Sequence, residues 1–118
     1  LIMSSIGNYS KDSVLEDILR YIEHNYMGPL KLENIAPLFG YNCSYLGKLF
    51  KQKTQKNFNT YLDELRIAHS KELLAQGDLK IYEVAEKVGY SNVDYFSTKF
   101  KRYEGITPAE YRRQQRGC

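Results

Sequence analysis

The sequence contains an internal repeat with a period of about fifty residues. The segment "KLENIAPLFGY" at 31–41 aligns with "KIYEVAEKVGY" at 80–90, at an offset of 49 residues. "YLGKLFK" at 45–51 aligns with "YFSTKFK" at 95–101 at an offset of 50, so the second turn has one added residue. A chain that writes one pattern twice is predicted to form two similar units, and two copies are too few for a solenoid.

Each copy has the residues of a helix-turn-helix, in which a short helix, a tight turn and a second helix follow one another. A small alanine lets the two helices approach closely, and a glycine in the turn tolerates a positive φ angle. A tyrosine after the glycine is expected to anchor the turn. These residues are Ala36, Gly40 and Tyr41 in the first copy, and Ala85, Gly89 and Tyr90 in the second.

The remaining periodicity is helical, and no segment alternates as a half-buried strand would. Apolar residues recur at helical spacing between Val14 and Tyr26, and a longer helix is predicted at 58–76, with Asn57 as its N-cap. The sequence "TPAE", which begins at Thr107, is a capping box with proline at the first helical position. We therefore expect an all-α fold of about seven helices, with two helix-turn-helix units joined by a long central helix.

The pattern divides the chain into four predicted segments. They are a linker from a missing N-terminal domain at 1–13, a first helix-turn-helix unit at 14–57, a connecting helix at 58–77, and a second unit at 78–116.

The first unit departs from the second at two positions. Pro37 lies inside its short helix and should shorten or kink it. Gln55 replaces the glycine at 105, so the helix before it is expected to end differently.

The net charge of +3 is modest, but the basic residues are clustered. Residues 43–57 contain four lysines and no acid, and the segment from Ser97 onward has six basic residues against two acids. Such clusters suit a polyanionic partner. No apolar run approaches the length of a membrane span and no signal peptide is evident, so we expect a cytoplasmic protein without membrane contact.

The length of the connecting helix is also informative. A helix of 19 residues at 58–76 spans roughly 28 Å at about 1.5 Å per residue. Successive major grooves on one face of B-DNA lie about 34 Å apart. Because the helix is somewhat shorter than the groove repeat, we hypothesise that bound DNA bends toward the protein.

The second copy, "IYEVAEKVGYSNVDYFSTKFKRYEGITPAEYRR" at 81–113, resembles the signature stretch of the AraC/XylS family of bacterial transcription regulators. The resemblance covers residues 14–113. It implies sequence-specific binding of double-stranded promoter DNA by two reading helices, at 43–53 and 92–103, in adjacent major grooves. The positions that match the family's base-facing residues are Ser44, Gly47, Lys48, Val93, Asp94 and Thr98.

The chemistry of these six side chains differs. Lys48 can donate to guanine, Ser44 can donate or accept, and Gly47 has no side chain with which to read a base. A thymine methyl group can contact Val93 or the methyl group of Thr98. Asp94 has two alternatives: it can accept from cytosine N4, or it can be the capping-box acid of its own helix, three residues after Ser91.

Other residues are expected to bind phosphates. Basic side chains along the reading helices would supply affinity that does not depend on sequence, and backbone amides at the two helix starts would add to it. The predicted phosphate-binding residues are Asn42, Lys51, Lys53, Ser91, Lys101 and Arg102.

Other classes of function find less support in the sequence. His24 and His69 are isolated, and the carboxylates of "LDEL" at 62–65 are expected on a helix surface, so we predict neither an enzyme nor a cofactor or metal site. The alternative is a helical protein-interaction module without DNA binding, which exposed tyrosines and an acidic first helix would suit. Duplex binding would weaken steeply with salt, whereas a mainly apolar protein interface would not.

The resemblance also implies a regulatory partner domain. The polar stretch "SSIGNYSKDS" at 4–13 reads as a linker, and "ILRYIEHNY" at 18–26 resembles family members fused to receiver domains of two-component systems. An effector-binding sensor domain is the other expectation. RNA polymerase is the further partner expected of a bacterial transcription regulator.

Overall fold

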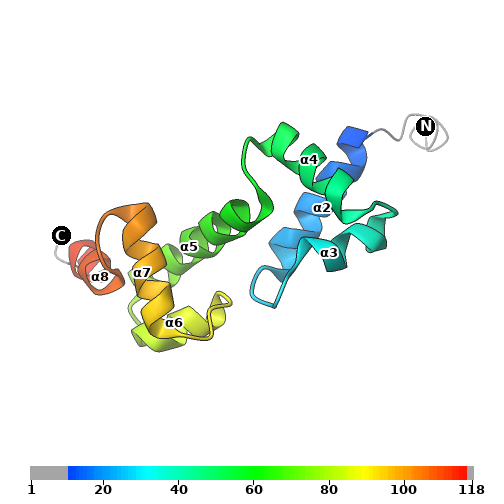
Figure 1. Cartoon of the computed structure of the whole chain (residues 1–118). Coiled ribbons are helices and arrows are strands. Elements are labelled where there is room, and N and C mark those ends of the chain that lie inside the picture. The colour runs from blue at the N-terminus through cyan, green and yellow to red at the C-terminus, as the bar shows by residue number, and fades with distance from the viewer. Residues whose placement is uncertain (1–10, 117–118) are drawn as a thin grey trace, which may run out of the picture. The chain divides into compact units, whose positions relative to one another are not determined.

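A computed structural model describes residues 11–116 of the 118, and all of the secondary structure in this range is helical (Figure 1). The all-α prediction is therefore confirmed. Positions 1–10 of the predicted linker lie outside the described residues, and the first helix begins at Lys11. The elements are α2 (Lys11–Asn25), α3 (Leu32–Ile35), the 3-10 helix η1 (Ala36–Phe39), α4 (Cys43–Thr54), α5 (Phe58–Gln76), α6 (Ile81–Lys87), α7 (Val93–Glu104) and α8 (Pro108–Arg116).

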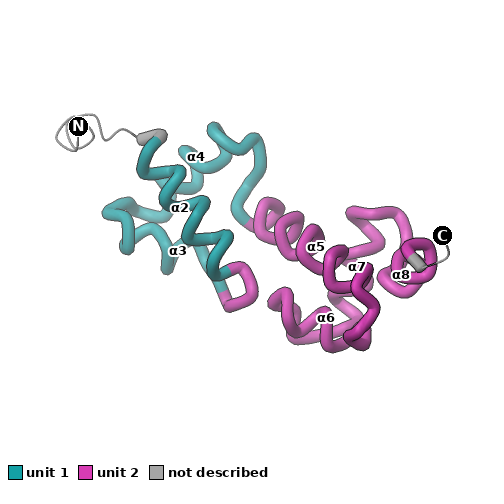
Figure 2. Tube along the Cα trace, turned by 180° about the vertical axis from the view of Figure 1, so that it is seen from behind, with its two compact units in different colours: residues 1–25, 30–58 teal, residues 26–29, 59–118 magenta. Residues whose placement is uncertain are grey.

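The chain forms two compact units, which Figure 2 distinguishes by colour. Unit 1 contains α2, α3, η1 and α4, and its described apolar core draws on each of them because each has one apolar face. The buried apolar side chains of unit 1 are Leu15, Ile18, Ile22, Ile35, Ala36, Leu46, Leu49, Phe50 and Phe58.

Pro37 shortens α3, the first helix of the helix-turn-helix in unit 1, as expected. The α-helical turns end at Ile35, and the chain continues as a 3-10 helix with Pro37 in its first turn. Proline has no amide hydrogen, so an α-helix through this position would lose one backbone bond. In unit 2 the matching helix α6 runs without interruption over seven residues.

Unit 2 contains α5 from Asn59 onward, α6 to α8, and residues 26–29, which lie between α2 and α3 in the sequence. Its core is an apolar cluster from α5, α6, α7 and the turn between α6 and α7. The predicted capping box begins α8: the Thr107 amide donates to Glu110 at 2.9 Å, and the Glu110 amide donates to the Thr107 hydroxyl at 3.2 Å. The bonds that Glu110 receives from Thr107 lower the pKa of its carboxyl. The apolar core cluster of unit 2 is formed by Ile67, Leu74, Val84, Ala85, Val88, Tyr90, Phe96 and Phe100.

The segment 26–29 is held in unit 2 by Arg66 of α5. The Arg66 guanidinium donates to the Tyr26 carbonyl through Nε and to the Gly28 carbonyl through Nη2, both at 2.8 Å. The Tyr26 ring stacks on His69, with ring centres 4.2 Å apart. This chain segment is therefore fastened by a planar bidentate donor and by an aromatic contact.

The two turn glycines are required for different reasons. Both have a positive φ angle, 78° at Gly40 and 106° at Gly89. A Cβ atom at Gly40 would meet nothing within 4 Å, whereas at Gly89 it would lie 2.8 Å from Arg66 Nε and 3.0 Å from the Tyr26 carbonyl oxygen. Gly89 thus gives Arg66 the room to reach residues 26–29.

Candidate nucleic-acid interface

The predicted reading helix of unit 1 is α4. Its N-cap is Asn42, whose side chain accepts from the Tyr45 amide at 2.8 Å. One face is buried through Leu46, Leu49 and Phe50, and the polar side chains of Ser44 and Lys48 are exposed. A Cβ atom at Gly47 would lie 3.6 Å from the Leu32 side chain, so this predicted base-facing position borders α3.

The predicted reading helix of unit 2 is α7, which begins at Val93. The N-cap is Asn92, whose side chain accepts from the Tyr95 amide at 3.0 Å. A capping box that began at Ser91 would need Ser91 as N-cap, so that alternative for Asp94 was wrong. Asp94 is instead the second residue of the helix and is exposed.

The other predicted base readers of α7 have unequal access to solvent. Thr98 is exposed. Val93 is half-buried and packs against the apolar cluster of unit 2. Phe96 and Phe100 are fully buried, so α7 is fixed to its unit on the side away from Thr98.

The predicted phosphate-binding residues are all exposed. The lysines at 51 and 53 lie in the last turn of α4, and Lys101 and Arg102 lie in the last turn of α7. Asn42 and Ser91 lie at the starts of the two reading helices, and the Asn42 side chain is engaged in the cap. Each reading helix therefore carries polar groups at its first turn and cations at its last turn.

Lys99 of α7 belongs to a separate polar cluster. Its Nζ lies 3.0 Å from Asp63 Oδ2 of α5, and the other carboxylate oxygen accepts from the Tyr90 hydroxyl at 2.7 Å. The Arg66 guanidinium lies over the Tyr90 ring, 5.2 Å from its centre. Burial and the bond to Asp63 raise the pKa of Tyr90, and the bond to Asp63 raises the pKa of Lys99.

The expectation of a solvated surface charge was therefore wrong for Asp63. Its side chain is 14% exposed and binds two groups distant in sequence. The helical spacing of "LDEL" indicates which residues share a helix face, but it carries no information about partners on other helices. The unmatched lysine at 99, which replaces a leucine of the first copy, is the sequence signal that could have indicated a buried acid.

Two exposed tyrosines were also absent from the predicted site. Tyr45 and Tyr95 occupy the same position in the first turns of α4 and α7, and both rings are exposed. Tyr45 packs against Tyr41, and Tyr95 packs against Tyr90. The repeat alignment at an offset of 50 could have identified them as a pair beside the predicted base readers.

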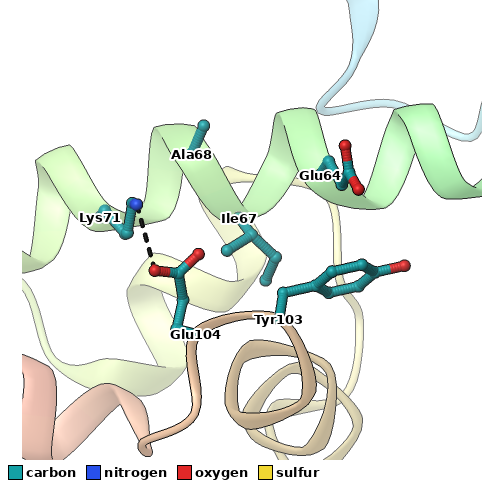
Figure 3. Close-up of a pocket in the computed structure, with 6 residues that line it drawn as sticks. All are labelled: Glu64, Ile67, Ala68, Lys71, Tyr103 and Glu104. Carbon is teal, nitrogen blue, oxygen red and sulfur yellow. Dashed lines mark hydrogen bonds and ion pairs between the residues drawn. The ribbon is translucent and has the colours of Figure 1, made fainter.

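An open hollow of about 220 Å³ lies between α5 and α7, and no predicted site residue lines it (Figure 3). An ion pair between Lys71 and Glu104 crosses it at 3.1 Å. Together with the Asp63–Lys99 contact, this pair gives α5 a second charged connection to α7. The hollow is lined by Glu64, Ile67, Ala68, Lys71, Tyr103 and Glu104.

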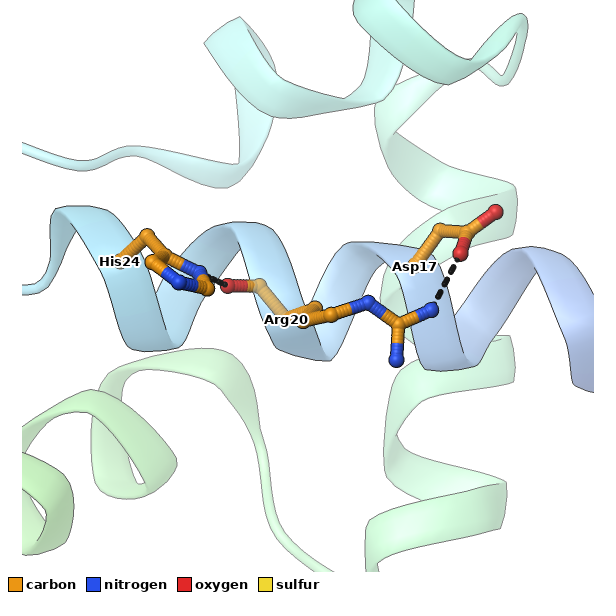
Figure 4. Close-up of polar contacts among 3 residues, drawn as sticks. All are labelled: Asp17, Arg20 and His24. Carbon is orange, nitrogen blue, oxygen red and sulfur yellow. Dashed lines mark hydrogen bonds and ion pairs between the residues drawn. The ribbon is translucent and has the colours of Figure 1, made fainter.

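The histidines have structural contacts. His24 Nδ1 lies 2.8 Å from the Arg20 carbonyl on α2, where Arg20 also pairs with Asp17 (Figure 4). His69 stacks on Tyr26 and lies 3.8 Å from Glu72. In residues 11–116 no three His, Cys, Asp or Glu side chains are grouped so that they could hold a metal ion. Over the same range, no helix is both long and apolar enough to cross a membrane.

The chain is similar to known regulators over most of its length. It is 37% identical over 116 residues to the transcriptional regulatory protein YesN of Bacillus subtilis, covering 95% of this chain and 32% of YesN. The C-terminal domain of the two-component response regulator yesN of Fusobacterium nucleatum is 39% identical, with a TM-score of 0.79, covering 82% of this chain and 95% of that one.

A third match carries the family's description. A transcriptional regulator of Chromobacterium violaceum, described as an AraC-type DNA-binding domain-containing protein, is 30% identical with a TM-score of 0.82, and the match covers 92% of this chain and 96% of that one. The chain spans 14%, 32% and 41% of the lengths of three curated regulators that it matches. The helix-turn-helix domain family matches residues 35–114. The chain therefore belongs to the AraC-type family of helix-turn-helix DNA-binding domains.

Proposed function

We propose that this chain binds double-stranded promoter DNA in a sequence-specific manner, with α4 and α7 in adjacent major grooves. The observation that carries the proposal is the matched pair of helices. Each is capped by an asparagine, buried on one face by leucine or phenylalanine, and polar on its exposed face. Family membership supports DNA binding over a protein-interaction module. A major groove about 12 Å wide admits such a helix.

The proposed base contacts follow from the exposed side chains. In α4, Lys48 donates to guanine O6 or N7, Ser44 donates or accepts, and Gly47 allows close approach without reading a base. In α7, Asp94 accepts from cytosine N4, and Thr98 presents a methyl group to thymine. Because the two helices carry different chemistry, the two half-sites differ in sequence.

Val93 contributes less to base reading than Asp94 or Thr98 on the same helix. Its side chain is half-buried against the apolar cluster, so only part of it is available to a thymine methyl group.

The proposed phosphate ligands are the exposed cations at the ends of the reading helices, with the amides near Asn42 and Ser91. Their contribution is affinity without sequence preference. The cations are Lys51, Lys53, Lys101 and Arg102.

We further propose that the chain acts as the DNA-binding part of a longer cytoplasmic regulator that works with RNA polymerase. The solved relative from Fusobacterium is the C-terminal domain of a two-component response regulator, which favours a receiver domain as the regulatory partner. An effector-binding sensor domain is the alternative. The family consists of regulator domains rather than enzymes, and we assign the chain no catalytic role or cofactor.

The experiment compares a proposed base-reading lysine, Lys48, with a proposed phosphate-binding lysine, Lys101. Selection from a random duplex pool first yields a specific site, and binding is then measured on that site and on random duplex over a range of salt. Lys48→Ala should weaken specific binding by about 1 to 3 kcal/mol and relax the preference at one base position. Lys101→Ala should weaken binding to both duplexes and lower the salt slope by about one. Equal losses on both duplexes for Lys48→Ala would contradict its reading role.

A further inference from the structure

The Asp63 carboxylate joins the connecting helix α5 to α7 through one oxygen and to the turn before α7 through the other. Oδ1 accepts from the Tyr90 hydroxyl at 2.7 Å, and Oδ2 pairs with Lys99 Nζ at 3.0 Å. The Asp63 and Lys99 side chains are 14% and 20% exposed. Such a charge-assisted contact, partly shielded from water, is short and directional. It therefore constrains orientation as well as distance.

Lys99 is well placed to transmit that constraint to the reading face. It follows Thr98 directly in the sequence, and its Nζ also lies 5.4 Å from the centre of the Tyr95 ring on the first turn of α7. Successive side chains of a helix point about 100° apart around its axis. A rotation of the helix therefore turns all of them together. Fixing Lys99 against α5 therefore fixes the direction in which Asp94 and Thr98 point.

The matching position of the first unit is apolar and cannot make such a contact. At the repeat offset of 50, the residue that matches Lys99 is Leu49, which is buried in the core of unit 1. Apolar burial is not directional, so α4 is seated at this position by shape alone. The two reading helices thus differ in how they are held as well as in what they present.

We propose that Asp63 is a positioning residue for base selection by α7, acting through Lys99 and Tyr90. The proposal rests on the proposed function, because it concerns how the second reading helix is aimed. It also accounts for the role of Lys99 itself: with its charge engaged by Asp63, Lys99 serves to orient α7 and not to bind phosphate. The residue that aims the helix lies on α5 and need not touch DNA.

Asp63→Asn tests this role because it keeps the shape of the side chain and removes its charge. Lys99→Leu breaks the same contact from the other side and copies the first unit. Glu104→Gln is the matched control, since it breaks the Lys71–Glu104 pair, which joins the same two helices at 3.1 Å but at the far end of α7 (Figure 3). Thermal unfolding of each variant shows whether it is folded, and Lys99→Leu keeps the test open if Asp63→Asn does not fold.

The readout is base preference at each position of a duplex selected with the parent chain. Thr98→Ala and Lys48→Ala identify the half-sites of α7 and α4. Asp63→Asn and Lys99→Leu should each reduce preference in the α7 half-site by about fivefold or more. Both should leave the α4 half-site unchanged, and Glu104→Gln should leave both half-sites unchanged.

Three results would overturn the positioning role: unchanged preferences in Asp63→Asn and Lys99→Leu, equal losses in both half-sites, or the same loss in Glu104→Gln. If the parent chain selects no duplex at all, the proposed function itself fails. Selection by the parent with an unchanged profile in the variants removes only the positioning role.

Discussion

Gln55 and Gly105 end the two reading helices in the same left-handed conformation, although only one of them is a glycine. Gln55 has a φ angle of 65°, and its amide donates to the Lys51 carbonyl at 2.9 Å. Gly105 has a φ angle of 85°, and its amide donates to the Lys101 carbonyl at 2.8 Å. The expectation that the first helix would end differently was therefore wrong. The bond that closes the helix end is available to either residue.

The cost of this conformation at Gln55 can be measured. A residue with a Cβ atom loses about 1 to 2 kcal/mol in the left-handed region, whereas glycine does not. Gln55→Gly should therefore raise the free energy of unfolding by about 1 kcal/mol. Gly105→Gln should lower it by a similar amount, because a Cβ atom there meets nothing within 4 Å and only the backbone is strained. Denaturant unfolding measures both, and a loss of stability in Gln55→Gly would contradict the argument.

At the scale of single helices, the starts of α4 and α7 depend on equivalent asparagines. Asn42 and Asn92 accept from the amides of Tyr45 and Tyr95. Removing an N-cap side chain typically costs about 1 kcal/mol. Asn92→Ala should lower the free energy of unfolding by that amount, and Ser91→Ala should change it by less than about 0.5 kcal/mol. Chemical denaturation of the two variants provides the comparison, and the reverse order would restore Ser91 as the cap.

The helices could be predicted closely because local chemistry determines them. Pro37, the capping box at Thr107 and the apolar spacing of α5 act within a few residues of their own positions. The alignment shows that the second turn has one added residue. It does not show whether Ser91 or Asn92 is the N-cap of α7. At Gly89 the same turn lies against Arg66, a neighbour distant in sequence that the alignment does not indicate.

The sequence predicts which residues lie on the exposed face of a helix, and the candidate site could be predicted to that extent. The repeat and the family resemblance indicate which positions of α4 and α7 lie opposite the buried residues, and those positions are exposed except for Gly47 and Val93, which are half-buried. The role of Asp63 could not be recognised from the pattern of its own helix, because its partners are on α7 and in the turn before α7. Contacts between residues distant in sequence depend on packing, which no local pattern encodes.

At the scale of the whole molecule, Arg66 fastens a segment of chain that is distant in sequence. Its guanidinium makes two bonds to backbone carbonyls, and hydrogen bonds from charged donors contribute up to a few kcal/mol. Arg66→Met should lower the free energy of unfolding by about 2 kcal/mol and speed hydrogen exchange at residues 26–28. Arg20→Met is the control, because Arg20 is 62% exposed and its pair with Asp17 should contribute less than about 1 kcal/mol. Equal effects in the two variants would contradict the role of Arg66.

Because residues 26–29 belong to unit 2, recombination that separates the two repeat copies is restricted. The sequence repeat suggests two copies that could be exchanged between proteins as separate cassettes. Yet a recombination breakpoint between α4 and α5 would leave Arg66 and the room at Gly89 on one side and the carbonyls that Arg66 binds on the other. A new pairing of the two halves would have to restore that segment. The duplicated halves are therefore expected to be inherited together.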